Sequence, residues 1–455
     1  MHPEKVNKIY FLGIGGIGMS ALARYYHRKG ILVSGYDKTP SALTNQLMAE
    51  GIQVHFQDSL SQIPEALDLV IYTPAVPYDL NIFVHLKNSG IPMRKRSEIL
   101  GMITRNYKTI AVAGTHGKTT VSTLTAHLLQ NSGIDCTAIL GGISKNTGTN
   151  LMVSEKSDWL VVEADEYDRS FLQIKPSIAT VTSMDADHLD IYNDYRNLKT
   201  GFLGFLSKTR PNGKIILKKG IDLKPVFDGI VYSYALKDKA DFYSENIKLK
   251  DDQYIFDLIT PFGKIKDCSP GMPGILNVEN TIAASANALL AGVNAKEIKM
   301  ALPGFQGIRR RFDYQIRAKD LIFIDDYAHH PEEIKAFVNS VRKIYPGKSI
   351  TGIFQPHLYS RTRDFADGFA AALSLLDRII LLPVYPAREE PIEGVDSAMI
   401  LSRIKIEKKI LVEKTRIFDT LDQHHYDILL TIGAGDIDLL IEPLKKHLQT
   451  KHCTT

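Results

Sequence analysis

Short apolar runs alternate with segments of helical periodicity along the whole chain, and this pattern predicts an α/β protein. The runs at 9–12, 109–113 and 159–162 are short enough to be buried strands. After the second run, Val121 and Leu124 begin a series of apolar residues at helical spacing. Strands that alternate with helices in this way imply parallel sheets with helices packed on their faces.

The pattern is clearest in the last third of the chain, where strands and helices alternate regularly. Strands are predicted at 321–325, 349–354, 378–384, 409–412 and 427–432. Helices are predicted at 331–344, 363–376, 396–405, 416–424 and 436–448. Between 214 and 266 there are only short strand-like runs, so we expect a peripheral β insertion there. The 455 residues correspond to about three domains.

Seven residues between the strand at 109–113 and the following helix have the composition of a phosphate-binding loop. They are Gly114, Thr115, His116, Gly117, Lys118, Thr119 and Thr120. Glycines let backbone N–H groups approach a phosphate, and the helix N-terminus adds partial positive charge. Lys118 would reach the terminal phosphates, and the Thr119 hydroxyl would hold Mg²⁺. The loop is shortened, because Val112 stands where a first glycine is usual.

Acidic residues follow the next two predicted strands of this block. Glu163, Asp165 and Glu166 follow the first, and Asp185, Asp187, His188 and Asp190 follow the second. The carboxyl ends of parallel strands share one edge of a sheet, where ligands bind. Mg²⁺ takes one or two carboxylates together with phosphate and water oxygens. Glu163 is the best candidate for a metal ligand, and His188 is the second.

A second glycine loop follows the first strand of the chain. Gly13, Gly15 and Gly18 fit the spacing G-x-G-x-x-G, and Asp37 ends the next strand. This arrangement is typical of Rossmann-like domains, in which the helix N-terminus binds a diphosphate. The candidate nucleotide-binding residues of this block are Gly15, Gly16, Ile17, Gly18, Met19, Ser20 and Asp37. On this block alone, NAD, another nucleotide diphosphate and a purely structural turn all remain open.

Polar residues also follow the predicted strands of the last third. They are Asp325, Asp326, Tyr327, His329 and His330; Gln355, His357, Arg361 and Arg363; Tyr385, Arg388, Glu389 and Glu390; and finally Gly433 and Gly435. If the strands are parallel, these groups meet at one binding edge.

Composition narrows the class of protein. There are 55 basic and 51 acidic residues without a long run of one sign, so we expect no nucleic-acid partner. The three cysteines (Cys136, Cys268 and Cys453) have no metal-ligand spacing. No apolar stretch approaches the ~20 residues that cross a bilayer, so we expect no membrane association and a cytoplasmic location.

These parts together suggest a reaction that joins two substrates. ATP would activate a carboxylate as an acyl phosphate, and an amine would then displace phosphate. Such chemistry depends on positioning and on neutralising negative charge. Lys118, Mg²⁺ and the arginines at 309–311 would supply that positive charge.

The motifs resemble those of the Mur ligases of peptidoglycan synthesis, and the resemblance covers essentially the whole chain. The matching segments are 13–20, 114–120, 163–172, 185–192, 325–331, 355–363, 385–391 and 433–437. The resemblance implies a Rossmann-like domain for a UDP-sugar at 1–106, a P-loop ATPase domain with a parallel sheet at 107–306, and a Rossmann-like amino-acid-binding domain at 307–455. It implies ATP-dependent ligation of L-alanine to the lactyl carboxylate of UDP-N-acetylmuramate through an acyl phosphate.

The resemblance also implies roles for individual residues. ATP would be bound by the loop at 114–120 with Asn277, Asn280, Arg310 and Asp326; Mg²⁺ by Thr119, Glu163 and His188; and alanine by His330, His357 and Arg361. Lys118, Glu163, His188 and Arg310 would form the catalytic group. Asn277 and Asn280 at a helix start would read an adenine edge, or else cap the helix. The chain departs from the family at Leu276, where a histidine is common, and at Arg309, where a glycine is frequent.

Two alternatives remain at this point. One is a recycling ligase that attaches a tripeptide to the same sugar nucleotide. The other, from a different class, is an NAD-dependent enzyme with a regulatory ATP site. The sequence leaves open whether the protein is a monomer or a homodimer.

Overall fold

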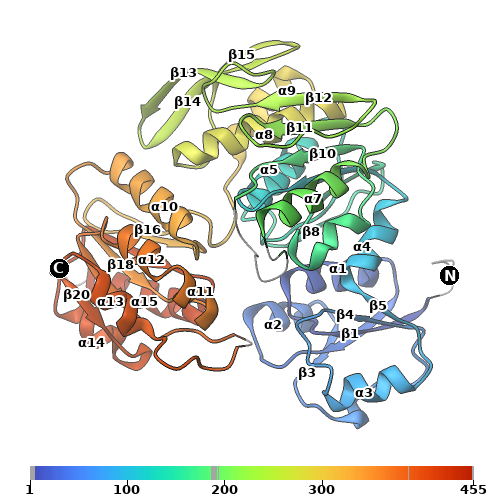
Figure 1. Ribbon diagram of the computed structural model, residues 1–455, viewed down its shortest axis with the longest axis horizontal. Coiled ribbons are helices and arrows are strands. Elements are labelled where there is room, and N and C mark those ends of the chain that lie inside the picture. Colours follow the sequence, from blue (N-terminus) through green and yellow to red (C-terminus); the bar gives the residue numbers. More distant parts are fainter. Residues whose placement is uncertain (1–5, 186–191, 193, 388, 453–455) are drawn as a thin grey trace. The chain divides into compact units, whose positions relative to one another are not determined.

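The computed structural model describes residues 6–185, 192, 194–387 and 389–452. Contacts between Cα atoms divide the chain into two compact units. The first comprises residues 1–247, 255–271 and 278–306, and the second comprises 248–254, 272–277 and 307–455. The prediction of an α/β fold with parallel sheets is confirmed (Figure 1).

The first sheet has five parallel strands in the order β3-β2-β1-β4-β5. Its elements are β1 (Lys8–Leu12), α1 (Ile17–Arg28), β2 (Leu32–Tyr36), α2 (Ala42–Ala49), β3 (Gln53–His55), η2 (Leu60–Gln62), β4 (Leu69–Tyr72), α3 (Asn81–Asn88), β5 (Met93–Lys95) and α4 (Arg96–Thr104). The first strand lies in the centre, so the loop that follows it opens in the middle of the sheet edge.

The second sheet has seven strands in the order β12-β11-β10-β6-β9-β7-β8. Its strands are β6 (Lys108–Ala113), β7 (Thr137–Ile139), β8 (Leu151–Met152), β9 (Trp159–Glu163), β10 (Ile178–Val181), β11 (Lys214–Lys218) and β12 (Ile230–Tyr234). Only the pair β7–β8 is antiparallel. The helices of this region are α5 (Lys118–Gln130), η3 (Tyr167–Gln173), α7 (Tyr195–Leu206), α8 (Ile275–Ala291), α9 (Ala295–Ala301) and η4 (Leu302–Gly304).

The expected β insertion at 214–266 is partly wrong. Strands β11 and β12 pair in parallel with β10 and extend the main sheet. A separate three-stranded sheet is formed by β13 (Tyr243–Lys250), β14 (Gln253–Thr260) and β15 (Gly263–Cys268). Local sequence pattern identifies a strand but does not identify the strand with which it pairs, because pairing depends on tertiary contacts.

A buried polar network joins the first two sheets within the first unit. The Arg24 guanidinium donates to Asn150 Oδ1 at 2.5 Å, and Asn150 Nδ2 donates to Ile17 O at 2.6 Å and to Ser20 Oγ at 3.0 Å. One apolar core contains Ile9 and Phe11 of the first sheet together with Val162 of the second.

The last sheet has the order β16-β17-β21-β18-β19-β20, and only β16 is antiparallel to its neighbour. Its elements are β16 (Asp313–Arg317), β17 (Ile322–Asp326), α10 (Pro331–Ile344), β18 (Ile350–Phe354), α11 (Tyr359–Asp364), α12 (Ala366–Leu373), β19 (Arg378–Leu381), α13 (Ser397–Arg403), β20 (Lys409–Leu411), η5 (Lys414–Arg416), α14 (Ile417–Asp422), β21 (Ile428–Ile432), η6 (Asp436–Leu440) and α15 (Ile441–His452). Ile322 and Ile324 enter one core and Phe323 enters another, so both faces of the sheet are covered. The helix predicted at 363–376 is two helices, α11 and α12.

In the described part of the chain, no helix has both the length and the apolar character needed to span a membrane.

Candidate active site

The loop between β6 and α5 has the backbone form of a phosphate-binding turn. Gly114 has a φ of +135° and Gly117 a φ of +83°, which is the region that glycine adopts most readily. A Cβ at Gly114 would also overlap the Thr182 hydroxyl. Gly117 directly precedes α5, so the backbone N–H groups of the first helical turn stand at the end of the loop without helical partners.

The Lys118 ammonium is held beneath this loop by two acceptors. It donates to Gly114 O at 2.7 Å and to Glu166 Oε1 at 2.9 Å. The Glu166 side chain is fully buried. Burial alone would lower the pKa of Lys118, but the charges of Glu166, Asp165 and Glu163 outweigh it, and the pKa lies above its ordinary value. The lysine is therefore a fixed positive charge at the turn.

The next residue of the helix pairs with the acid at the end of β9. The Thr119 hydroxyl donates to Glu163 Oε2 at 2.8 Å. Gly141, after β7, lies so close to this carboxylate that a Cβ there would overlap it. A hydroxyl and a carboxylate placed side by side are oxygen donors of the kind that Mg²⁺ takes together with phosphate and water, so these residues fit that ion.

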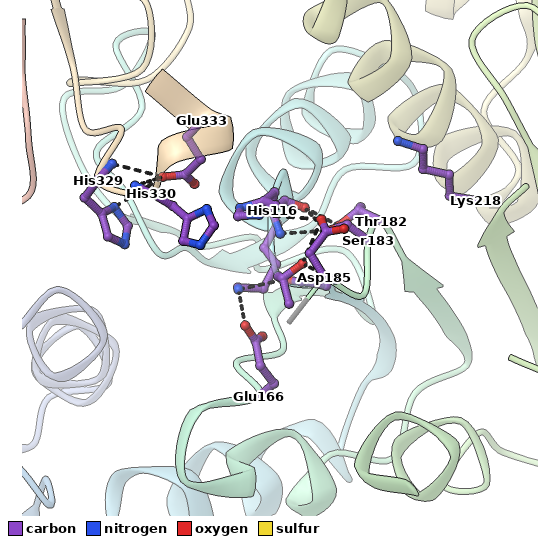
Figure 2. Close-up of polar contacts among 12 residues, drawn as sticks. His116, Glu166, Thr182, Ser183, Asp185, Lys218, His329, His330 and Glu333 are labelled. Carbon is purple, nitrogen blue, oxygen red and sulfur yellow. Dashed lines mark hydrogen bonds and ion pairs between the residues drawn. The ribbon is translucent and has the colours of Figure 1, made fainter. Parts of the chain in front are cut away.

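Residues at the end of β10 hold the other side of the loop (Figure 2). Ser183 Oγ lies 2.9 Å from Thr115 Oγ1 and accepts from His116 N at 2.7 Å. The Thr182 hydroxyl donates to His116 O, and His116 Nε2 lies 3.6 Å from Asp185 Oδ2. Thr182 and Ser183 were not predicted. Both residues directly follow β10, which pairs in parallel with β6. Their position after a strand was therefore the sequence signal that could have placed them beside the loop that follows β6.

Of the other residues predicted at ATP, Asn280 lies at the loop. A Cβ at Gly117 would come within 3.0 Å of Asn280 Oδ1. Asn277 lies inside α8, where its side chain donates to Pro273 O at 2.6 Å, so it is not the residue before the helix. Thr120 is buried in the first turn of α5. The predicted metal ligand His188 lies outside the described residues.

The first glycine loop lies between β1 and α1. Gly13 has a φ of +83°, and Gly16 directly precedes the helix. The predicted Asp37 accepts a hydrogen bond from Gly15 N at 2.7 Å, so its carboxylate orders the loop backbone. The remaining predicted positions, Ile17, Gly18, Met19 and Ser20, are the first four residues of α1.

In the second unit, Arg310 is anchored at the carboxyl edge of the last sheet. Its φ is +64°, its Nε donates to Asp325 Oδ2 at 3.2 Å, and its Nη2 donates to Gly433 O at 2.5 Å. The other oxygen of Asp325 accepts from the Thr431 hydroxyl at 2.7 Å. The strands β17 and β21 are neighbours, and their exits together fix the guanidinium.

Two buried aspartates at the end of β17 have raised pKa values. Burial raises the pKa of Asp325 to about 7, although the Arg310 charge opposes this. Burial likewise raises the pKa of the predicted ATP residue Asp326 to about 6 against the charge of Arg311. Asp326 accepts from Phe312 N at 2.7 Å and from Ala328 N at 2.8 Å. Its carboxylate therefore orders the backbone just before β16 and just after β17.

The two histidines before α10 are held by one carboxylate (Figure 2). Glu333 Oε2 accepts from the backbone N–H groups of His329 at 3.0 Å and His330 at 3.3 Å. Burial lowers the pKa of His329 to about 4, although Glu333 acts in the opposite direction. His329 is therefore neutral at pH 7. The His330 ring packs edge-on against Phe365 at a centroid distance of 4.7 Å.

The exits of β18 and β19 lie against each other, as predicted for a shared edge. The rings of His357 and Tyr385 stack with centroids 5.8 Å apart. Ser360, beside the predicted Arg361, donates from its N–H to Glu389 Oε2 at 2.9 Å and from its hydroxyl to Glu389 Oε1 at 2.5 Å. The roles of Glu333 and Glu389 as supports were not predicted, because each acts on a segment that only the fold brings near.

Comparison with known proteins agrees with this arrangement. Three family descriptions match successive parts of the chain: "Mur ligase family, catalytic domain" at 8–108, "Mur ligase middle domain" at 112–288, and "Mur ligase, glutamate ligase domain" at 310–441. The chain belongs to the Mur ligase family.

Curated relatives in this family are similar over nearly their whole length. The UDP-N-acetylmuramate–L-alanine ligase of Parabacteroides distasonis is 48% identical over 98% of each chain. The enzyme of the same name from Porphyromonas gingivalis strain W83 is also 48% identical, over 98% of this chain and all of the relative.

Solved structures of Mur ligases share the fold. The UDP-N-acetylmuramate–alanine ligase of Thermotoga maritima matches with a TM-score of 0.84 and 27% identity, over 98% of this chain and 99% of that one. The murein peptide ligase of Psychrobacter arcticus matches with a TM-score of 0.72 and 22% identity, over 97% and 98% of the two chains. The second likeness concerns the fold alone, so the fold does not separate the predicted activity from the recycling alternative.

Proposed function

We propose that this protein joins L-alanine to the lactyl carboxylate of UDP-N-acetylmuramate and releases ADP and phosphate. The observation that carries the proposal is the phosphate loop with its paired side chains, in a chain that is 48% identical to ligases named for this reaction. The product would be UDP-N-acetylmuramoyl-L-alanine, an intermediate of peptidoglycan synthesis.

The ATP phosphates would bind at the loop 114–120. Backbone N–H groups at the start of α5 would donate to them, and Lys118 would neutralise their negative charge. Thr119 and Glu163, with His188, would hold Mg²⁺, which when bound adds positive charge at the phosphates. Asn277 and Asn280 are proposed at the adenine, and Arg310 and Asp326 are proposed as further ATP contacts.

The reaction would proceed in two displacements. A carboxylate oxygen of the sugar nucleotide attacks the γ-phosphorus, the bond to the β–γ bridging oxygen breaks, and ADP leaves. The amine of alanine then attacks the acyl carbon, and the C–O bond to phosphate breaks. The amine loses a proton in this step, and the released phosphate leaves as the anion. Lys118 and Arg310 would oppose the repulsion between the carboxylate and the γ-phosphate, because fixed charges need no reorganisation during the transfer.

The sugar nucleotide would bind at the edge of the first sheet, and alanine would bind at the edge of the last sheet. The N–H groups at the start of α1 would donate to the UDP diphosphate, and Gly16, which directly precedes the helix, would allow its close approach. His330, His357 and Arg361 would place alanine, and Arg361 would pair with the alanine carboxylate. A cytoplasmic location and a monomeric or homodimeric state remain predictions from the sequence.

Release of ADP in the presence of different substrate pairs tests the proposal. Release that requires both UDP-N-acetylmuramate and L-alanine supports it. Release with the tripeptide and not with alanine would identify the recycling ligase. Binding of NADH without ADP release from the substrate pair would overturn the ligase assignment.

A further inference from the structure

The first glycine loop lacks a charge that its proposed ligand needs. A diphosphate carries about two negative charges when bound, whereas a helix N-terminus supplies roughly half a positive charge. Residues 13–20 contain neither lysine nor arginine. The acidic Asp37 also lies against this loop, with its carboxylate bonded to Gly15 N. A nearby cation would therefore make a large difference to diphosphate binding.

One arginine side chain lies directly on the first turn of α1. A Cβ built on Gly18 would lie 2.9 Å from Arg96 Nη1, 3.2 Å from Arg96 Cδ and 3.4 Å from Arg96 Cζ. The guanidinium thus covers the third glycine of the G-x-G-x-x-G pattern. Gly18 is the second residue of α1, so the arginine stands among the N–H groups that are proposed to receive the diphosphate.

Arg96 also contacts the acidic turn that follows β9. Its Nη2 lies 3.7 Å from Asp165 Oδ2, and the other oxygen of Asp165 accepts from Tyr167 N at 3.1 Å. The side chains of Arg96 and Asp165 are 21% and 36% exposed, so a ligand can reach the guanidinium. At 3.7 Å this ion pair is looser than a direct hydrogen bond, and it leaves N–H donors of the guanidinium for another anion.

We propose that Arg96 is a binding residue for the diphosphate of the sugar nucleotide. Its guanidinium contacts the diphosphate over the first turn of α1 while it keeps its loose ion pair with Asp165. Gly18 is a glycine because any side chain there would displace this guanidinium. An arginine suits the site because its planar N–H groups match phosphate oxygens in pairs. The inference rests on the proposed function, since it assumes a UDP-sugar at this loop.

Calorimetric binding of UDP-N-acetylmuramate, UDP and uridine tests the inference on the full chain. Arg96→Met keeps much of the length of the side chain and removes its charge. We expect this variant to bind UDP-N-acetylmuramate and UDP about 10–100-fold more weakly, the range for a lost charged hydrogen bond. Uridine, which has no phosphate, should bind equally to the variant and the wild type. ATP binding should change much less than UDP binding, because Arg96 meets this region through Asp165, an acid outside the loop at 114–120.

Two further variants separate binding from support of the fold. Asp165→Asn removes the ion pair and keeps the arginine, so UDP binding should be retained to within about threefold. Gly18→Ala should weaken UDP binding, because the added Cβ moves the guanidinium away from the turn. If Arg96→Met weakens uridine and UDP equally, or if Asp165→Asn weakens UDP as much as Arg96→Met does, the arginine is only structural and the inference is wrong.

The failure of this inference differs from a failure of the proposed function. Wild-type protein that binds UDP-N-acetylmuramate, with Arg96→Met binding it equally well, would overturn the role of Arg96 and leave the ligase assignment intact. Wild-type protein that binds NADH and not the sugar nucleotide would overturn the proposed function itself.

Discussion

The two glycine loops of the first unit use the same backbone device with different side chains. Each follows a central strand that pairs in parallel with its neighbours, and each contains glycine with a positive φ before the following helix starts. The loop before α5 continues into Lys118 and Thr119, and both side chains are bonded to acids at the ends of other elements. The loop before α1 continues into Ile17 and Gly18, neither of which has a polar side chain, and Asp37 at the exit of the next strand accepts from Gly15 N.

The difference teaches that a glycine turn provides shape and partial charge, while the flanking side chains decide which ligand can react there. A turn that carries its own ammonium and a hydroxyl beside a carboxylate suits a phosphate that is transferred. A turn with neither suits a diphosphate that is only held. Four experiments test this contrast.

Removal of the lysine should have the largest effect. We expect Lys118→Met to lower the rate of ADP release by about 10²–10³-fold, because a fixed positive charge at the proposed phosphate site is lost. The variant also leaves Glu166 buried without its cation, which destabilises the fold by about 3–5 kcal/mol. The double variant Lys118→Met/Glu166→Gln should recover thermal stability and stay inactive. Wild-type rates in either variant would contradict the mechanism.

The carboxylate beside Thr119 should matter next. Glu163→Gln removes a charged oxygen from the proposed Mg²⁺ site. Mutation of residues that merely support metal ligands already lowers metal affinity or activity roughly 10–100-fold. We expect a decrease of at least that size in ADP release, together with a higher Mg²⁺ concentration for half-maximal rate. Thr119→Ser keeps the hydroxyl and serves as the control. An unchanged Mg²⁺ titration in Glu163→Gln would remove this residue from the metal site.

A change in the first loop should act on only one substrate. A Cβ on Gly15 would lie 2.7 Å from Thr44 Cγ2 and 2.9 Å from Asp37 Oδ2. Crowding of this kind costs about 1–3 kcal/mol, so Gly15→Ala should raise the KM for UDP-N-acetylmuramate about tenfold and leave the KM for ATP unchanged. Gly133→Ala, whose added Cβ would be 3.7 Å from the nearest atom, is the matched control. An equal rise in both KM values would mean that the two loops do not serve separate substrates.

The surroundings of a third glycine turn, at Gly433, should make the stability of the fold depend on pH. Its carbonyl and Asp325 hold Arg310, and burial raises the pKa of Asp325 from 3.8 to about 7. The folded state therefore favours the protonated carboxyl. The stability that results is complete below pH 3.8 and is lost as the pH rises through about 7.

Asp325→Asn cannot ionise, so its stability relative to the wild type should rise between these pH values. The slope is at most about 1.4 kcal/mol per pH unit. Urea unfolding of both proteins at pH 5 and pH 8 gives the difference directly, and groups common to both proteins cancel. A difference that does not change with pH would show that Asp325 keeps an ordinary pKa in the fold.

Much of the fold follows from sequence pattern because strands and helices have different apolar periods. The predicted bounds of α10 coincide with the observed Pro331–Ile344, where proline starts the helix and apolar residues line one face. Sequence pattern did not predict strand pairing correctly where the paired strands are far apart along the chain. Strands β11 and β12 were assigned to an insertion although they pair with the main sheet, and β16 was not predicted at all.

The sequence by itself determined the two glycine loops, the polar strand exits and the family, because these depend on residue types at short spacing. Only the tertiary structure decided which acid meets Lys118, what holds Arg310 and which side chain lies over Gly18. Glu166 lies 48 residues from Lys118, and Gly433 lies 123 residues from Arg310. The physical reason is that hydrogen bonds and charges act over a few ångströms, and the fold alone brings such distant residues within that range.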